Sequence, residues 1–352
     1  MRRPEGAATI IGIGTYLPRD VVSNAELIKR TGIKSSDRGI RVRTGIGQRH
    51  FVSGDDEHPS DMAVLASRQA LLTAGATGKK IHTLLVATDR PDYQSPSTAS
   101  IVHGELNLPE HVLAKDEKAA CAGGVMVLHE AAARVRDEGG QALAIATNTL
   151  SSAILVPPVD PRTVILFGDG AGAMVIEKRP ESHVPVFAFR TIPNRAALGS
   201  DIGGERFVPE GPQDPRIGIR MDGKVVGATA VPTMTELAIV AAQKAGVYNH
   251  QSGRIEWDEI DLLVPHQGNG HLVAAVGKEL GAPSEKLVST IEHHGNTSAT
   301  TIFLALDHAL REGQAPPKAR VLFTSFGAGF VAAAGIMNVD IQRPTNSSIT
   351  TT

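Results

Sequence analysis

The sequence has a single cysteine, few aromatic residues and almost no net charge. One cysteine among 352 residues excludes an intrachain disulfide, which is typical of a reducing compartment. Aromatic residues make up only 4% of the chain, so we expect a core of Ala, Val, Ile and Leu. The formal net charge of −2 gives no overall attraction for nucleic acid or for an anionic membrane.

Long hydrophobic runs are also missing. No apolar run reaches the roughly 18–20 residues that a bilayer-spanning helix needs. The N-terminal residues MRRPEGAATI lead directly into a strand pattern and lack the apolar stretch of a signal peptide. We therefore expect a cytoplasmic protein that binds neither membrane nor nucleic acid. Its length allows two domains or one large two-part domain.

Short apolar runs alternate with helical patterns along the chain. The runs predict buried strands at Ala8–Ile13, Ile81–Ala87, Ala142–Ala146, Gly172–Ile176, Asp261–Val264, Val321–Thr324 and Ala332–Val339. Helices are predicted at Ser60–Thr73, Gly123–Glu138, Val231–Ala245, His271–Leu280 and Thr300–Glu312. This alternation predicts an α/β fold whose sheet is covered on both faces.

The two halves of the chain have a similar rhythm. Each closes on a glycine-rich segment that we interpret as a hairpin, Phe167–Gly172 in the first half and Phe326–Phe330 in the second. A polar, proline-containing stretch at Arg179–Pro185 suggests domains at residues 1–182 and 183–352. Within the second half, Leu198–Gly218 reads as an exposed loop, and the polar tail from about residue 344 reads as disordered.

Cys121 is the first candidate for chemistry. It lies in the sequence AACAGG, between a strand and the helical pattern that starts at Gly123. A helix N-terminus favours the thiolate, so the pattern predicts a lowered pKa and a reactive thiol. The local context is equally compatible with a buried cysteine in a tight turn.

Two further polar segments follow predicted buried structure. His266 comes directly after the strand Asp261–Val264, the usual place for ligand chemistry in an α/β sheet. Asn296 lies in the segment HHGNTSA, which opens the last predicted helix. His293 and His294 do not predict a metal site, because adjacent histidines point in different directions and no further ligand stands at zinc-like spacing. Gly12 and Gly14 lack the rest of a dinucleotide fingerprint, and Asp169 is interpreted as structural.

Five motifs in order resemble one family. They are ACAGG, FGDGAGA, VPHQGN, HGNTSA and FGAGF, and the segment Arg43–Ile46 matches a further signature. The chain resembles the β-ketoacyl-acyl-carrier-protein synthase III family of the thiolase superfamily from about Thr9 to Asn338. This resemblance implies a five-layer αβαβα thiolase fold from two similar halves, a homodimer, and an acyl carrier protein as partner. It implies no cofactor and no metal beyond the phosphopantetheine or coenzyme A that carries the substrate.

The resemblance also implies roles for individual residues. Cys121 would be the nucleophile that becomes acylated, and His266 and Asn296 would stabilise the enolate of the second substrate. The backbone N–H groups of Cys121 and Ala328 would form the oxyanion hole. Arg43, Ser95, Gly227 and Asn269 would line the substrate channel.

Several positions depart from the family pattern. Gly39, Ile154 and His271 stand where an aromatic ring and two basic residues would contact coenzyme A. Ser95 and Gly227 stand where bulky aromatic residues would narrow the pocket. These departures favour an enzyme that fuses carrier-bound β-ketoacyl chains into a pyrone-type product. The alternatives are a fatty-acid-priming synthase, an acyltransferase that acts on a hydroxyl, and a non-catalytic partner subunit, which the intact Cys121, His266 and Asn296 argue against.

A basic segment suits an acidic carrier protein. The segment contains one acidic residue, Asp37, and seven basic residues: Lys29, Arg30, Lys34, Arg38, Arg41, Arg43 and Arg49. Such a local patch attracts an acidic partner by electrostatic complementarity, although a solvated charged loop would have the same composition.

Overall fold

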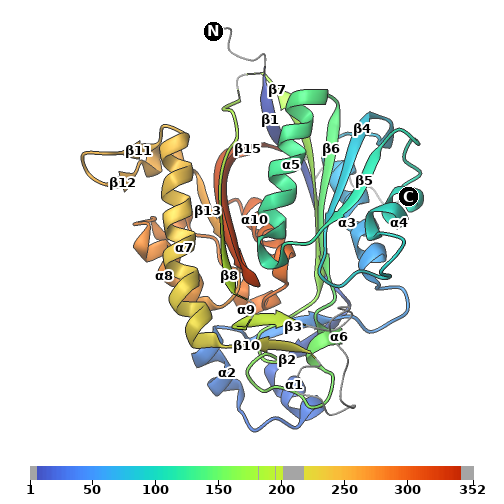
Figure 1. Ribbon diagram of the computed structural model, residues 1–352, viewed down its shortest axis with the longest axis vertical. Coiled ribbons are helices and arrows are strands. Elements are labelled where there is room, and N and C mark those ends of the chain that lie inside the picture. Colours follow the sequence, from blue (N-terminus) through green and yellow to red (C-terminus); the bar gives the residue numbers. More distant parts are fainter. Residues whose placement is uncertain (1–5, 181, 195, 201–217, 342–352) are drawn as a thin grey trace.

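The structure is a computed structural model that describes residues 6–180, 182–194, 196–200 and 218–341. Its main feature is one nine-stranded mixed sheet (Figure 1). Eight strands follow one another in the spatial order β13 (Leu262–Pro265), β14 (Lys318–Gly327), β15 (Gly329–Asp340), β1 (Ala7–Tyr16), β7 (Gly170–Arg179), β6 (Gln141–Asn148), β4 (Ile81–Ala87) and β5 (Leu113–Glu117). The ninth strand, β8 (Val186–Asn194), pairs with β15.

Helices pack on both outer faces of this sheet, and further helices pack between its two halves. They are α1 (Asn24–Thr31), α2 (Asp37–Thr44), α3 (Pro59–Thr73), α4 (Thr98–Glu105), α5 (Gly123–Glu138), α6 (Ser151–Ile154), α7 (Gly223–Lys244), α8 (Gly270–Glu279), α9 (Ile291–His294) and α10 (Thr301–Arg311). The short 3-10 helices are η1 (Gly78–Lys80), η2 (Ala120–Ala122), η3 (Trp257–Glu259), η4 (Ser284–Lys286) and η5 (Ser298–Thr300). Three small two-stranded sheets pair β2 (Asp20–Ser23) with β3 (Gln48–Phe51), β9 (Leu198–Ser200) with β10 (Ile219–Met221), and β11 (Tyr248–Asn249) with β12 (Arg254–Ile255).

Three buried clusters define five layers. The central cluster joins α5 and α10 to both halves of the sheet. A second cluster lies between α7, α8 and the half that holds β13, β14 and β15. A third lies between α3, α4 and the half that holds β4, β6 and β7. The order is helix, sheet, helix, sheet, helix, as the resemblance implies, and Figure 1 shows α7, α5 and α4 at successive places across the molecule.

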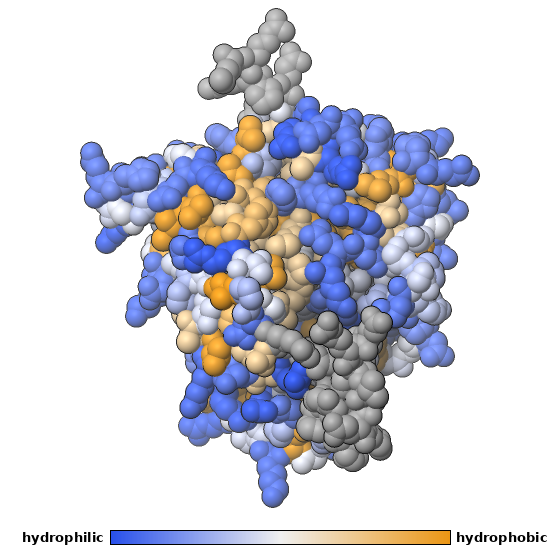
Figure 2. All heavy atoms as spheres, viewed as in Figure 1, coloured by the Kyte–Doolittle hydropathy of each residue, from blue (hydrophilic) through white to orange (hydrophobic). Residues whose placement is uncertain are grey.

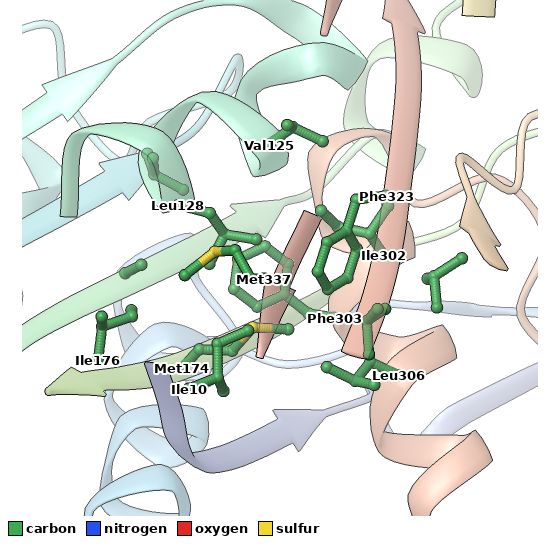
Figure 3. Close-up of a cluster of buried hydrophobic side chains, with 14 of the residues drawn as sticks. Ile10, Val125, Leu128, Met174, Ile176, Ile302, Phe303, Leu306, Phe323 and Met337 are labelled. Atoms are coloured by element: carbon green, nitrogen blue, oxygen red, sulfur yellow. The ribbon is translucent and has the colours of Figure 1, made fainter. Parts of the chain in front are cut away.

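The central layer is packed from aliphatic side chains and a few rings. Figure 3 shows this cluster, in which residues of α5 and α10 meet those of four strands: Ile10, Val125, Leu128, Met174, Ile176, Ile302, Phe303, Leu306, Phe323 and Met337. Close approach requires glycine at Gly172, where an added Cβ would lie 2.3 Å from Cβ of Phe303. At Gly14, an added Cβ would lie 2.2 Å from the carbonyl oxygen of Ala66. The glycine pair in β1 therefore serves the packing of α3 against the sheet.

The predicted strands and helices are present, with shifted ends. Helix α7 begins at Gly223, two turns earlier than predicted, because Asp222 caps it and accepts hydrogen bonds from the backbone of Lys224 and Val225. The second glycine-rich segment joins the antiparallel strands β14 and β15, as predicted. The first is not a hairpin: α6 and a long connection separate β6 from β7, and Phe167 instead forms an isolated bridge with Asn296.

The predicted loop and tail lie largely outside the described residues. Of the predicted loop Leu198–Gly218, the first three residues form β9, and residues 201–217 lie outside the described residues, as does the tail from about 344. The boundary between residues 182 and 183 falls between β7 and β8, and the division into two domains remains a prediction.

Helix α7 qualifies the expectation about apolar runs. By length and composition it could cross a membrane, and it is the one helix of the described residues that meets this test. Its inner face, however, packs Met234, Leu237 and Ala238 against the sheet. Figure 2 shows apolar residues at the surface where Figure 1 draws α7 and β8, and Phe189 of β8 is 43% exposed. A core helix has this composition too, so a single such helix is weak grounds for a membrane span.

Candidate active site

A cavity among the described residues has a volume of about 1150 Å³ and collects the predicted catalytic residues. Cys121, His266 and Asn296 all line it. Cys121 follows β5, His266 follows β13, and Asn296 follows α9. Three segments that are far apart in the sequence therefore meet at one cavity. Two of them follow strands of the sheet, whose ends are the usual location of a ligand site in α/β proteins.

Cys121 is held at the start of α5 by contacts from β14. It is the middle residue of η2, and Ala122 separates it from Gly123, the first residue of the helix. Its carbonyl oxygen accepts a hydrogen bond of 2.6 Å from Oγ of Ser325. An added Cβ on Gly327 would lie 2.6 Å from the Cys121 backbone nitrogen, so only glycine allows the turn between β14 and β15 to come this close. The thiol is thereby fixed relative to both halves of the fold.

The protonation of Cys121 differs from the sequence expectation. Burial raises the pKa of the Cys121 thiol to about 12. Burial outweighs the hydrogen bonds from Ser298 and from the Cys121 backbone, which lower the thiol pKa. The predicted lowered pKa is therefore wrong for the resting site, and the thiol needs a proton acceptor before it can attack.

His266 is buried and neutral. Its ring is 3% exposed, and burial lowers its pKa to about 3. Nδ1 lies 2.8 Å from Oγ1 of Thr301, the first residue of α10. This contact fixes the ring plane and leaves Nε2 to face the cavity.

Asn296 points its amide at the same place as His266. Its Oδ1 accepts a hydrogen bond of 2.8 Å from the backbone of Ser298, which leaves Nδ2 as the free end. An added Cβ on Gly268 would lie 3.0 Å from Nε2 of His266 and 3.8 Å from Nδ2 of Asn296. Two side-chain nitrogens therefore converge on one point of the cavity. Two hydrogen-bond donors that meet in this way can stabilise one developing oxyanion.

The predicted channel residues divide into two groups. Gly227 and Asn269 line the cavity, and so does Ala328, in the turn next to Cys121. Arg43 does not line it, because its guanidinium donates to the carbonyl of Gly39 and to Oγ of Ser35 on the surface of α2. Ser95 is exposed and does not line the cavity of its own chain, so its place in the channel remains a prediction.

At the three positions where contacts with coenzyme A are expected to be missing, the residues have structural roles. The backbone N–H of Gly39 donates to Oγ of Ser36 in the N-cap of α2. Ile154 is buried in a hydrophobic cluster with Leu150, Leu166 and Phe167, three residues that line the cavity. Nε2 of His271 contacts the carbonyl oxygen of Val42 at 2.8 Å. Gly39 and Ile154 supply neither a cation nor a ring, and only His271 of the three lines the cavity.

The remaining sequence candidates have structural explanations. Asp169 is fully buried and accepts hydrogen bonds from the backbone of Ser151 and Val52, which confirms its structural interpretation. Burial lowers the pKa of His294 to about 4. Within the described chain, no group of three His, Cys, Asp or Glu residues is placed to hold a metal ion.

The basic segment is smaller than the sequence suggests. Arg49 is fully buried and donates to the carbonyl of Ile165, so it does not belong to the surface patch. Arg30 is paired with Asp20 and Glu26, and Arg41 is paired with Asp37 and Glu292. Lys29, Lys34 and Arg38 remain exposed, with no ion pair among the described residues.

Sequence reasoning missed Asp89 and Ser298. Asp89 follows β4 and lines the cavity, and Oγ of Ser298 lies within contact distance of both Asp89 and Cys121. No motif identifies Asp89, because only the fold brings the end of β4 next to η2. Ser298 stands in the HGNTSA motif, but the motif predicts a role only for Asn296, two residues earlier.

Comparisons with known proteins agree with the resemblance. The family model described as 3-oxoacyl-[acyl-carrier-protein (ACP)] synthase III matches residues 115–193, and its C-terminal counterpart matches residues 251–339. A β-ketoacyl-[acyl-carrier-protein] synthase III from Coxiella burnetii is 36% identical over 94% of this chain and 99% of its own length.

Solved structures match over almost the whole chain. The 3-oxoacyl-(acyl carrier protein) synthase III of Pseudomonas aeruginosa has a TM-score of 0.83 at 31% identity, covering 96% of this chain and all of its own. A priming β-ketosynthase from a polyketide biosynthetic pathway has a TM-score of 0.85 at 31% identity, covering 97% and 99%.

The layered fold and these matches define a condensing enzyme of the thiolase fold. Such an enzyme transfers an acyl group from one thioester and joins it to another. More narrowly, the chain belongs to the β-ketoacyl-acyl-carrier-protein synthase III family.

Proposed function

We propose that the chain carries its acyl intermediate on Cys121. The thiolate attacks the carbonyl carbon of the first thioester, a new C–S bond forms, and the carrier thiol leaves. The backbone N–H groups of Cys121 and Ala328 are proposed to hold the carbonyl oxygen during this step. The close approach of Gly327 to the Cys121 amide supports this, because it brings the Ala328 turn to the same side of the sulfur.

In the second step, His266 and Asn296 are proposed to stabilise a carbanion. The second thioester forms an enolate, whose oxygen accepts hydrogen bonds from Nε2 of His266 and Nδ2 of Asn296. Its carbon attacks the acyl carbonyl, a C–C bond forms, and the bond to Cys121 breaks. The convergence of the two nitrogens near Gly268 supports these roles.

For the substrates, we propose two carrier-bound β-ketoacyl chains that the enzyme fuses, with a pyrone-type product. The observation that carries this proposal is the cavity of about 1150 Å³, which exceeds the roughly 300–1000 Å³ of ordinary ligand pockets. Gly227 adds to it, because an added Cβ there would meet no atom within 4 Å. The space beside Gly227 is therefore open to a second chain.

A second candidate is fatty-acid priming from an acyl-coenzyme A and a malonyl carrier protein. It is favoured by the 36% identity to a protein named β-ketoacyl-[acyl-carrier-protein] synthase III over nearly the whole chain. The loss of cationic and aromatic side chains at Gly39, Ile154 and His271 argues for a carrier-bound donor instead. Stacking on a base contributes roughly 1–3 kcal/mol, so its loss weakens coenzyme A binding by about one to two orders of magnitude.

The partner is proposed to be an acidic acyl carrier protein. Lys29, Lys34 and Arg38 are exposed on and beside α1 and α2. Helix α2 borders the cavity, because the carbonyl of Arg43 accepts a hydrogen bond from Asn269. A carrier docked on these cations would have its arm near the cavity. In line with the family resemblance, we also propose a cytoplasmic homodimer without a bound cofactor.

The substrate proposal is tested by comparing two donors. We expect kcat/KM for a medium-chain β-ketoacyl carrier protein to exceed that for acetyl-coenzyme A by at least tenfold, with product identified by mass spectrometry. A preference for acetyl-coenzyme A with a malonyl carrier would instead establish the priming function.

A further inference from the structure

Asp89 places a carboxylate in the wall of the cavity next to Cys121. It lies two residues after the end of β4, and its backbone N–H donates to Oδ1 of Asn148 at 3.1 Å. Its side chain is partly exposed and lines the cavity. It is the only carboxylate among the described residues that do so.

Ser298 connects this carboxylate to the thiol. Its Oγ lies 3.3 Å from Oδ2 of Asp89 and 3.5 Å from Sγ of Cys121. A hydroxyl group has one proton to donate, and a carboxylate only accepts. The hydroxyl therefore donates to Asp89 and is left to accept from the thiol of Cys121. The three side chains form a continuous path for a proton.

The backbone holds Ser298 in this position. Its φ angle is 56°, a left-handed conformation that a residue with a side chain rarely adopts. The hydrogen bond from its backbone N–H to Oδ1 of Asn296 secures this conformation. Strain of this kind concentrates at functional sites, where the surrounding structure compensates for it.

Neither His266 nor Asn296 offers a group that could take the thiol proton at neutral pH. The pKa of Cys121 is about 12, so the thiol is protonated. His266, with a pKa of about 3, is too weak a base, and its Nδ1 is engaged by Thr301. Burial raises the pKa of Asp89, which makes it a stronger base than an exposed carboxylate.

We propose that Asp89 accepts the proton of Cys121 through the Ser298 hydroxyl when the first acyl group is loaded. The thiol proton passes to Oγ of Ser298 as the Ser298 proton passes to Oδ2 of Asp89, which leaves a thiolate and a carboxylic acid. The thiolate forms the new thioester, the old C–S bond breaks, and the departing carrier thiolate takes the proton from Asp89. No proton is gained or lost over the whole step, and Asp89 is again a carboxylate. The inference rests on the proposed function of Cys121 as acyl acceptor.

The charges around Asp89 define its pH dependence. Lys118, which precedes η2, faces it and lowers its pKa, against the larger effect of burial. The backbone N–H of Ala120 also favours the carboxylate. Arg90, the next residue along the chain, donates to Oγ of Ser152, and His266 shares the cavity as a neutral ring. Loading should therefore fall at low pH, where Asp89 becomes protonated.

The substitution Asp89→Asn separates this account from a simple effect of charge. Removing a negative charge near a thiol lowers the thiol pKa, so an electrostatic role alone predicts faster acylation and faster alkylation by iodoacetamide. Loss of a proton acceptor predicts the opposite. We expect loading near neutral pH to slow by about 100-fold, as is typical when a general base is removed. The deficit should shrink as the pH rises toward 10, because hydroxide then deprotonates the thiol.

The experiment follows the intact mass of the full-length protein against time, from pH 6 to 10, with one acyl carrier protein donor. Ser298→Ala should slow loading as well, and Asp89→Glu should restore part of the rate. Circular dichroism checks that each variant folds. If Asp89→Asn does not fold, Ser298→Ala alone tests the proposal. Wild-type protein that never loads would contradict the function of Cys121. Wild-type protein that loads, beside an Asp89→Asn variant of equal or greater rate and the same pH profile, would overturn the role of Asp89.

Discussion

Nδ1 of His266 lies 2.8 Å from Oγ1 of Thr301, and this contact orients the ring. The Thr301 hydroxyl also lies 3.0 Å from the carbonyl oxygen of Ser298, so its single proton has two acceptors to choose from. When it donates to Nδ1, the ring proton of neutral His266 is on Nε2 and points into the cavity. The proposed stabilisation of an enolate requires this arrangement.

Thr301→Val should therefore impair condensation while acyl loading stays normal. Valine keeps the shape of threonine but cannot donate to Nδ1, so the Nε2–H tautomer loses the hydrogen bond that would favour it. We expect condensation to slow by about tenfold to 100-fold, as for the loss of one oriented hydrogen bond in a transition state. Mass spectrometry of the enzyme measures loading, and chromatography of the product measures condensation. An equal loss in both steps would show that Thr301 has only a structural role.

Gly227→Phe tests the proposed volume for a long chain. The ring would project into the open space beside the cavity, since nothing lies within 4 Å of an added Cβ. The variant should load short acyl groups normally and reject medium and long chains. Ala228→Phe is the matched control, because Ala228 is the next residue of α7, is exposed and does not line the cavity. An unchanged chain-length preference in Gly227→Phe would remove this position from the channel.

Charge reversal tests the carrier docking surface. Lys29→Glu combined with Lys34→Glu should raise KM for a carrier-bound substrate by about tenfold and leave kcat unchanged, because rim charges act mainly on association. The same acyl group on free pantetheine should be used equally by the wild type and the variant. Lys79→Glu with Lys80→Glu, in η1, is the control for a general change of charge. An equal rise in KM for free pantetheine substrates would place the effect inside the site.

His266 makes the stability of the fold depend on pH. The folded protein lowers its pKa to about 3, whereas the unfolded chain titrates near its ordinary value of about 6.5. The contribution of His266 to the free energy of unfolding is therefore complete above about pH 6.5 and is lost as the pH falls toward 3. At about 1.4 kcal/mol for each pH unit, the loss between pH 6.5 and 5 is about 2 kcal/mol. Urea unfolding should show this fall, and His266→Gln should reduce it by that amount; equal slopes in both proteins would contradict a buried neutral ring.

Much of the fold could be predicted because the buried strands read as apolar runs. Strands such as β4 and β6 are covered on both faces, so nearly every residue in them is buried and each contains a continuous apolar run, Leu84–Ala87 in β4 and Ala142–Ala146 in β6. Strand β8 was missed because it is half-exposed and mixes Phe187 and Ala188 with Arg190. The hairpin predicted at Phe167 failed because its partner, Asn296, lies in the other half of the chain and no local pattern records that contact.

The site shows the same division between local and distant information. Motifs located Cys121, His266 and Asn296, because each stands where an element ends. The pKa of Cys121 could not be predicted from its helix, since distant segments around Ser325 and Ser298 bury the sulfur. Asp89 has no motif of its own, and only the pairing of β4 with β5 brings it beside Cys121.

The acyl-cysteine is the central claim, and intact-mass analysis of the loaded enzyme tests it most directly. After incubation with a carrier-bound acyl donor, the wild-type protein should gain the mass of one acyl group, and peptide mapping should place it on Cys121. Cys121→Ala should gain nothing and form no product. An acylated Cys121→Ala protein, or one that still forms the carbon–carbon bond, would contradict the account.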